Sequence, residues 1–274
     1  MSLIVASILV LMFLNLVLGS VSIPLKSVWN IICGLGDEPV TWQNIVWKSR
    51  LPQALTALVA GAGLAISGLQ MQTVFRNPLA GPSVLGISSG ASMGVAFVVL
   101  LSGSLGGVAL SKLGFMGEIA LSIAAVIGSL SVMALIVYVS QKVKGNVTLL
   151  IIGVMIGYVA NAVIGVLKFF SVEEDIRAYV IWGLGSFSRV SGNQMMLFVA
   201  IMAILIPLSF LLIKTLNLML LGDGYARNLG LNIKRARLLV ITSAGVLTAI
   251  VTAYCGPVSY THLRAHETVL ALVC

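Results

Sequence analysis

The chain has 274 residues, of which 59% are hydrophobic and only 9% charged, with a formal net charge of +8 and a mean hydropathy of +1.11. A water-soluble domain carries about 25% charged residues, so the composition excludes a surface covered by polar groups and indicates an integral membrane protein. Helices are favoured over an outer-membrane barrel, because the apolar runs are continuous and do not alternate with polar residues. We therefore expect an all-α, polytopic helix bundle.

Seven long segments of the chain lack Asp, Glu, Lys and Arg, and each is long enough for one membrane crossing, which needs about 20 apolar residues. In chain order, we expect helices near residues 3–22, 52–73, 84–102, 118–139, 147–169, 194–213 and 238–256. The first segment lacks the basic start of a signal peptide, so we expect a retained helix there. The odd number of crossings would place the two ends of the chain, as given, on opposite sides.

The charges between these segments favour a cytoplasmic N-terminus. With the N-terminus inside, the inner segments hold eight Lys and Arg and the outer segments seven, which decides little under the positive-inside rule. Six of the eight acids fall outside, however, and five inner cations lie in one loop, 214–237. The expected topology is therefore multi-pass with the N-terminus in the cytoplasm.

Small residues recur at four-residue spacing in the third and fifth segments, and two interpretations are open. Helices in lipid associate through close backbone approach at small residues, so the stripes can be packing faces. They can also form a smooth wall beside a transport pathway, which Asn161 favours because an amide in the membrane needs a partner or water. The two stripes are Gly86, Gly90 and Gly94, and Gly153, Gly157, Asn161 and Gly165.

The sequence contains no P-loop and no zinc-hydrolase motif. The GxxxxGK[ST] and HExxH patterns are missing, so no nucleotide site and no zinc-hydrolase site is predicted. The two histidines, His262 and His266, and the three cysteines form no strong metal or disulfide pattern. We expect no catalytic residue, no cofactor and no metal site. Apart from Glu118, the first residue of the fourth, the seven expected helices contain no acid or histidine to couple protons, so energy for transport would come from another subunit.

Two loops that the topology places inside have distinctive sequences. The segment 75–82 contains Pro78 and Pro82, which end or start helices. In the segment 221–232, Gly222 and Gly224 break the preceding helix, and residues 225–229 are expected to form a short helix stopped by Gly230. That short helix is either part of a solvated loop or a protrusion that fits a socket on a partner.

At these residues the sequence resembles the FecCD-type permeases of ATP-binding-cassette importers, which carry iron–siderophore complexes, haem or vitamin B12 into bacteria. The resemblance covers residues 1–257. The matching segments are Arg50-Leu51-Pro52, Gly68 to Gln72, Asn77-Pro78-Leu79-Ala80-Gly81-Pro82, Leu85 to Ala91, Trp182 to Ser186, and Leu221 to Asn232.

The resemblance implies an organisation that composition alone does not give. Such a subunit usually has ten membrane helices, pairs with a second copy or a homologue, and lies in the bacterial inner membrane among its lipids. A cytoplasmic ATPase dimer and a periplasmic or lipid-anchored binding protein complete the importer, and no nucleic acid is involved. The alternatives are a secondary transporter or channel fragment and, less favoured, a membrane-embedded enzyme.

The resemblance also divides the chain and implies roles for particular residues. Residues 1–257 would be an incomplete permease domain with about seven of the ten helices, and 258–274 a non-native tail, because the sequence departs from the family pattern after Pro257. Arg50 would dock a glutamate of the binding protein, with a headgroup anchor as the alternative. The remaining implied residues are Gly222, Asp223, Ala226, Arg227, Leu229 and Gly230 for ATPase coupling; Asn77, Pro78, Leu79, Asn146 and Val147 for the cytoplasmic gate; and Gly153, Gly157, Asn161 and Gly165 for the pathway lining.

Overall fold

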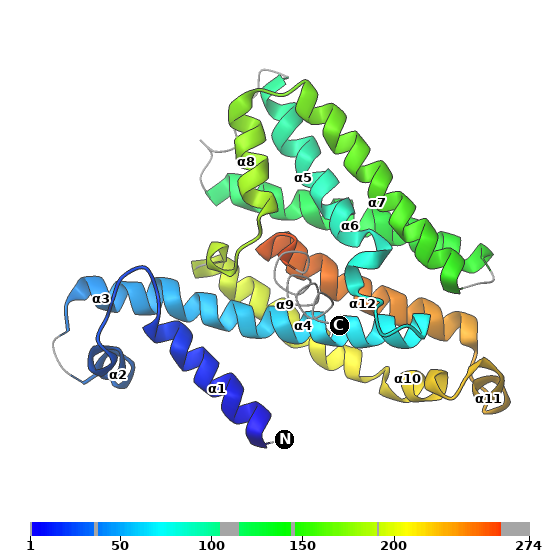
Figure 1. The fold of residues 1–274 in the computed structure, drawn as a ribbon, viewed down its shortest axis with the longest axis horizontal. Helices are drawn as coiled ribbons and strands as arrows, with labels where there is room; N and C mark the ends of the chain where they lie inside the picture. Colours follow the sequence, from blue (N-terminus) through cyan, green and yellow to red (C-terminus); the bar gives the residue numbers. More distant parts are fainter. Residues whose placement is uncertain (1, 36–37, 105–114, 144–145, 191, 259–274) are drawn as a thin grey trace, which may run out of the picture. The chain divides into compact units, whose positions relative to one another are not determined.

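The structure is a computed structural model that describes residues 2–35, 38–104, 115–143, 146–190 and 192–258. Throughout this part of the chain the regular elements are helices and no strand occurs (Figure 1), which confirms the predicted all-α class. The chain divides into two compact units. The first comprises Met1–Gly61 with Phe187–Ile201, and the second Ala62–Ser186 with Met202–Cys274.

The first unit is built around the N-terminal helices. Its elements are α1 (Ser2–Val17), α2 (Leu25–Cys33), α3 (Val40–Ile45), a π-helical turn (Val46–Arg50), the start of α4 (Leu51–Phe75), a 3₁₀ turn (Phe187–Arg189) and the start of α9 (Gly192–Phe210). A small apolar core holds it together, formed by Leu16, Ile23, Val28, Ile31 and Val46. The core brings the end of α1 against α2 and the π-helical turn.

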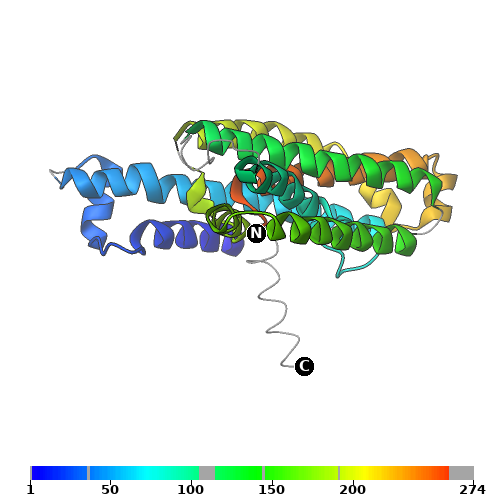
Figure 2. The same cartoon turned by 90° about the horizontal axis from the view of Figure 1, so that it is seen from above.

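The second unit contains the rest of α4 and of α9 and most of the long helices. Its other elements are η2 (Pro82–Leu85), α5 (Ile87–Ser104), α6 (Phe115–Lys142), α7 (Asn146–Phe169), α8 (Glu173–Gly183), α10 (Ile213–Leu220), α11 (Asp223–Asn228) and α12 (Ile233–Cys255). α5 packs against α6 on one side and α7 on another, and α12 packs on α6 (Figures 1 and 2). α5 is therefore the central helix of this unit.

All seven predicted segments form helices, and five helices are long and apolar enough to cross a membrane. These five are Val40–Phe75, Met116–Lys142, Val147–Phe169, Gly192–Phe210 and Ile233–Cys255. Ser2–Val17 and Ile87–Leu101 are shorter apolar helices. α1 ends five residues before the predicted boundary at residue 22, and α5 begins three after residue 84, because Gly86 adopts a left-handed conformation (φ +72°) between η2 and α5.

Glycines allow α5 and α6 to approach at the backbone. A Cβ atom on Gly94 would lie 2.2 Å from the carbonyl oxygen of Ala124, and one on Gly128 would lie 2.2 Å from that of Gly90. These distances leave no room for a side chain, so Gly90 and Gly94 are packing residues. Gly86 belongs to the same sequence stripe but meets α7, so the stripe serves two neighbouring helices.

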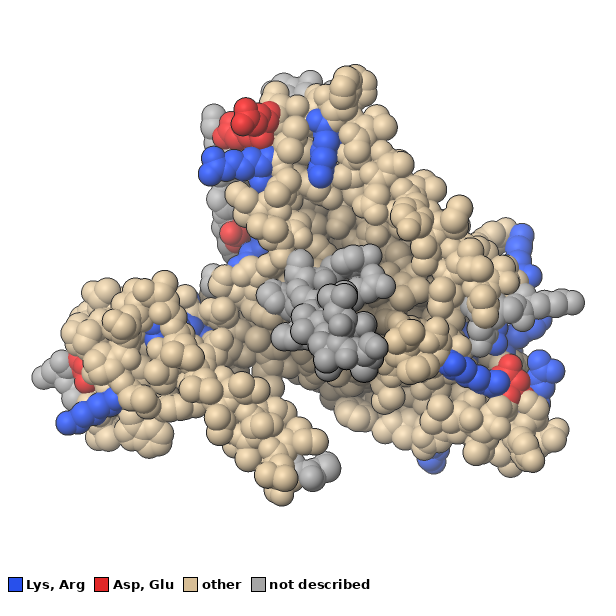
Figure 3. All heavy atoms as spheres, viewed as in Figure 1, with Lys and Arg blue, Asp and Glu red and all other residues tan. Residues whose placement is uncertain are grey.

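Charged side chains of the second unit lie in two regions on the face shown in Figure 3, one around α8 and one around α10 to α12, with uncharged surface between them. The acids at the start of α8 are Glu173, Glu174 and Asp175, whereas α11 and the first turn of α12 carry Arg227, Lys234 and Arg235. The topology derived from the sequence assigns these two groups to opposite sides of a membrane.

Candidate functional site

A cavity of about 230 Å³ lies in the second unit among η2, α5 and α7. Two serines, a tyrosine and an asparagine contribute polar groups, and no charged side chain lines it. Its walls are formed by Ser83, Val84, Gly86 and Ser89 on one side and by Gly153, Val154, Gly157, Tyr158 and Asn161 on the other. The cavity can therefore offer hydrogen bonds from hydroxyl and amide groups, but no carboxylate or imidazole lines it.

Close backbone contacts set the shape of this cavity. A Cβ atom on Gly86 would lie 2.9 Å from the carbonyl oxygen of Gly153, and one on Gly153 would lie 2.7 Å from that of Val84. A Cβ atom on Gly157 would lie 3.4 Å from Ser89 Oγ. η2 and α7 are thus in direct backbone contact, and any side chain at Gly86 or Gly153 would force them apart.

Three of the four residues predicted to line a pathway border this one cavity, namely Gly153, Gly157 and Asn161. Gly165 is on the same helix but does not line the cavity, and nothing lies within 4 Å of a Cβ atom built on it. On the opposite wall, Gly86 belongs to the other predicted stripe. Ser83 and Ser89 were not predicted, because they are distant from α7 in sequence and a local pattern carries no sign of the contact.

The turn after α4, predicted as part of a gate, is held by its own hydrogen bonds. Asn77 Oδ1 accepts the Leu79 backbone N–H at 2.9 Å, and Gln72 Nε2 donates to the Pro78 carbonyl at 2.9 Å. Leu79 is 82% exposed at the tip. The second predicted gate segment begins α7 with Asn146, and Val147 is 70% exposed.

The predicted short helix in 221–232 is present as α11, which begins two residues before the expected start at Tyr225. Gly230 has φ +85° and ends the helix as predicted. Ala226 is fully buried, so its side chain faces the chain's own interior. The sequence had instead assigned Ala226 to the surface that couples to the ATPase. Tyr225 (72% exposed) and Leu229 (61% exposed) lie one turn apart and form the outward apolar surface.

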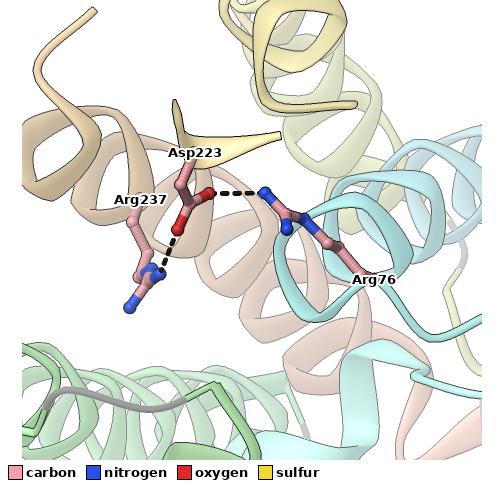
Figure 4. Close-up of polar contacts among 3 residues, drawn as sticks. All are labelled: Arg76, Asp223 and Arg237. Carbon is pink, nitrogen blue, oxygen red and sulfur yellow. Dashed lines mark hydrogen bonds and ion pairs between the residues drawn. The ribbon is translucent and has the colours of Figure 1, made fainter. Parts of the chain in front are cut away.

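Asp223, another predicted coupling residue, joins three elements through ion pairs (Figure 4). Its carboxylate oxygens lie 2.5 Å from Arg76 Nη2, after α4, and 3.9 Å from Arg237 Nη2, on α12. Neither arginine was predicted as a site residue. Arg76 is 147 residues from Asp223 in the sequence, so no local pattern indicates their contact. α11, predicted to couple to the ATPase, is thereby connected to the turn predicted as a gate.

Arg50, predicted to dock a binding protein, has a buried side chain in the first unit. It is only 5% exposed, and its Nη1 donates at 2.8 Å to the carbonyl oxygens of both Leu16 and Val17, while Nη2 donates to Val21. A Cβ atom on Gly19 would lie 2.7 Å from Nη2, so a glycine at 19 leaves room for the guanidinium. Arg50 therefore caps the C-terminal end of α1, a role that the sequence did not reveal.

The described part of the chain contains no group of three or more His, Cys, Asp or Glu that could hold a metal ion. His262 and His266 lie outside the described residues. Cys33 is exposed and Cys255 is buried, and the two do not form a disulfide with each other.

Known proteins resemble this chain in sequence and in structure. The sequence profile of the FecCD transport family matches residues 7–273. The chain is 32% identical over 245 residues to the Hemin transport system permease protein HmuU of Yersinia pestis, covering 89% of this chain and 70% of that protein. It is 35% identical over 221 residues to the Vitamin B12 import system permease protein BtuC of Photorhabdus laumondii, covering 80% of this chain and 63% of the relative.

A solved structure described as an inward-facing conformation of a metal-chelate type ABC transporter also resembles this chain. The TM-score is 0.72 and the sequence identity 27%, over 91% of this chain and 73% of the other. The similarity thus extends across most of the chain in both sequence and structure, while the relatives are longer.

Proposed function

The chain belongs to the FecCD transport family, and we propose that it is the membrane-spanning permease subunit of an ATP-binding-cassette importer. The observation that carries this proposal is the match of 89% of the chain to a permease of a haemin transport system. The substrate would be a metal chelate of the haemin, cobalamin or iron–siderophore type. A separate ATPase supplies the energy, so this subunit is a transport protein and not an enzyme.

The membrane topology in this proposal uses seven crossings, the five long helices together with α1 and α5, with the N-terminus in the cytoplasm. The separation of charged residues around α8 from those around α10 to α12 supports two polar ends with an apolar zone between them. Residues 258–274 would be a non-native tail. A second copy or a homologue would complete the permease in the bacterial inner membrane.

The translocation pathway would run beside α7, along the cavity lined by Gly153, Gly157 and Asn161. Hydroxyl and amide groups without charge can bind a bulky chelate weakly, which a pathway needs if the substrate is to leave again. Gly165 would extend this wall. The cytoplasmic end would be closed by two turns, formed by Asn77, Pro78 and Leu79 and by Asn146 and Val147.

α11 would be the element that receives motion from the ATPase. Tyr225 and Leu229 are exposed apolar residues on a short helix flanked by charges, and such a surface can seat in a cleft of a partner. Arg227 is exposed beside them and can pair with an acid on the partner. Ala226 anchors the helix from its buried side, and Gly222 and Gly230 set its two ends.

Uptake into vesicles tests the proposed function directly. The permease is reconstituted with its ATPase and binding protein, and uptake of haemin, cobalamin and iron–siderophore complexes is measured with and without ATP. We expect uptake of one class only when ATP and the ATPase are both present. Uptake that continues without the ATPase would instead identify a secondary transporter or channel.

A further inference from the structure

Arg76 holds a backbone conformation that usually belongs to glycine. At the end of α4, the Asn77 N–H donates to the Gln72 carbonyl at 3.2 Å and the Arg76 N–H to the Thr73 carbonyl at 3.4 Å, the two bonds of a Schellman motif. Arg76 sits at the left-handed position of that motif with φ +49°. A side chain there costs conformational energy, because Cβ crowds the backbone.

The same motif ends α2 and α11, where the equivalent residues are Gly34 (φ +68°) and Gly230 (φ +85°). The end of a helix therefore does not by itself require arginine, and the residue that suits this conformation is glycine. A strained residue that persists points to a role for its side chain. At position 76 that side chain carries the guanidinium that meets Asp223.

The Arg76–Asp223 pair joins the turn after α4 to the start of α11. Asp223 is the first residue of α11, and its other carboxylate oxygen faces Arg237 of α12 at 3.9 Å (Figure 4). Gly222, just before it, has φ +104° and gives the backbone a conformation in which other residues are strained. The ion pair is therefore a direct link between the start of α11 and the turn that begins at Arg76.

We propose, on the basis of the proposed function, that Arg76 and Asp223 form a strut through which movement of α11 displaces the turn of residues 76–80. Asp223 and Arg76 are then positioning residues of the transport cycle. The turn is internally tied by Asn77 and Gln72, so a pull on Arg76 moves the turn as one piece. Arg237 holds the carboxylate to α12.

Because the pair is exposed, we expect it to position α11 and the turn and to add little to the stability of the fold. The Arg76 and Asp223 side chains are 46% and 42% exposed, and such a surface pair stabilises a fold little. When a partner covers α11, the pair loses water and becomes stronger. The link would therefore tighten when an ATPase is bound.

The first experiment measures the strut in the permease alone. Spin labels are placed at Leu79→Cys and Asn228→Cys after the other accessible cysteines are changed to serine. We expect one narrow distance distribution in the parent protein, and a broadened one after Asp223→Asn or Arg76→Gly. Lys234→Gln is the control, because it removes an exposed charge from the first turn of α12, whereas the ion pairs of Asp223 are with Arg76 and Arg237. An unchanged distribution in both test variants overturns the proposal, whether or not the chain transports.

The second experiment measures coupling in the complete importer. Arg76→Gly relieves the backbone strain, so its unfolding midpoint should not fall, yet transport per ATP hydrolysed should fall about fivefold, the upper end for an exposed pair. Asp223→Glu should retain coupling. If Arg76→Gly transports as much substrate per ATP as the unmodified importer, the strut is wrong. If the unmodified importer shows no ATP-dependent uptake, the proposed function is wrong instead, and the spin-label distances still test the strut.

Discussion

Replacing Arg50 by alanine should release the C-terminal end of α1. The guanidinium donates to three carbonyl groups, those of Leu16, Val17 and Val21, from a side chain that is 5% exposed. A hydrogen bond from a charged donor contributes about 1.5–3 kcal/mol, but water can replace part of this where the segment is exposed, as Val21 is at 41%. We therefore expect a loss of about 3 kcal/mol, equivalent to a roughly hundredfold increase in local opening.

Hydrogen exchange measured by mass spectrometry in detergent tests this prediction. Peptides covering residues 15–23 should exchange roughly a hundredfold faster in Arg50→Ala, because exchange reports the free energy of local opening. Arg50→Lys should be intermediate, since a single ammonium group cannot reproduce the planar fork. Lys48→Ala is the matched control, because Lys48 is exposed two residues away. Parental exchange in Arg50→Ala would refute the capping role.

Three further predictions concern the second unit. Gly94→Ala should destabilise the protein by about 1–3 kcal/mol, because the new Cβ would lie 2.2 Å from the Ala124 carbonyl oxygen. Gly68→Ala is the control and should leave the stability unchanged, because nothing lies within 4 Å of a Cβ atom there. Equal unfolding midpoints for the two variants would refute the packing argument. Burial raises the pKa of the Asp175 carboxyl and Glu174 raises it further, so the stability of the fold falls as pH rises through that pKa. Asp175→Asn should therefore raise the unfolding midpoint at about pH 8 but not at about pH 4. An effect of the same size at both pH values would count against this assignment. Leu229→Glu should reduce association with the ATPase at least tenfold without changing the unfolding midpoint, which a binding assay in detergent would check.

The long helices could be predicted from the sequence because lipid imposes a simple rule. A crossing must be apolar over about 20 residues, and charged residues mark its ends. α7 and α12 therefore appear within a few residues of their predicted starts and ends. α2, α8 and α10 were missed, since they have 9, 11 and 8 residues and lie between charges or prolines, where neither length nor continuous hydropathy identifies a helix.

The candidate site was predictable where it depends on one helix. The spacing of Gly153, Gly157 and Asn161 correctly placed them on one face of α7, and the structure puts that face on a cavity. The facing wall could not be predicted, because it depends on how η2 and α5 meet α7. The same limit applies to Ala226: the sequence shows a short helix but not which of its sides packs inward.

The two arginines in this structure show why a motif residue needs its partners before it receives a role. Arg50 lies in a segment that resembles the family and Arg76 directly precedes one, yet their acceptors are 29 to 34 and 147 residues away, respectively. For Arg50 this changes how docking must be tested. An Arg50→Glu variant places a carboxylate against backbone carbonyl oxygens, which repel it, so the end of α1 would open. The variant could then bind the binding protein less tightly because α1 has opened, even if Arg50 makes no contact with that partner. Reduced affinity for the binding protein therefore supports docking only if residues 15–23 keep parental exchange, and Arg50→Lys, which retains the charge, should preserve affinity if charge alone attracts the partner.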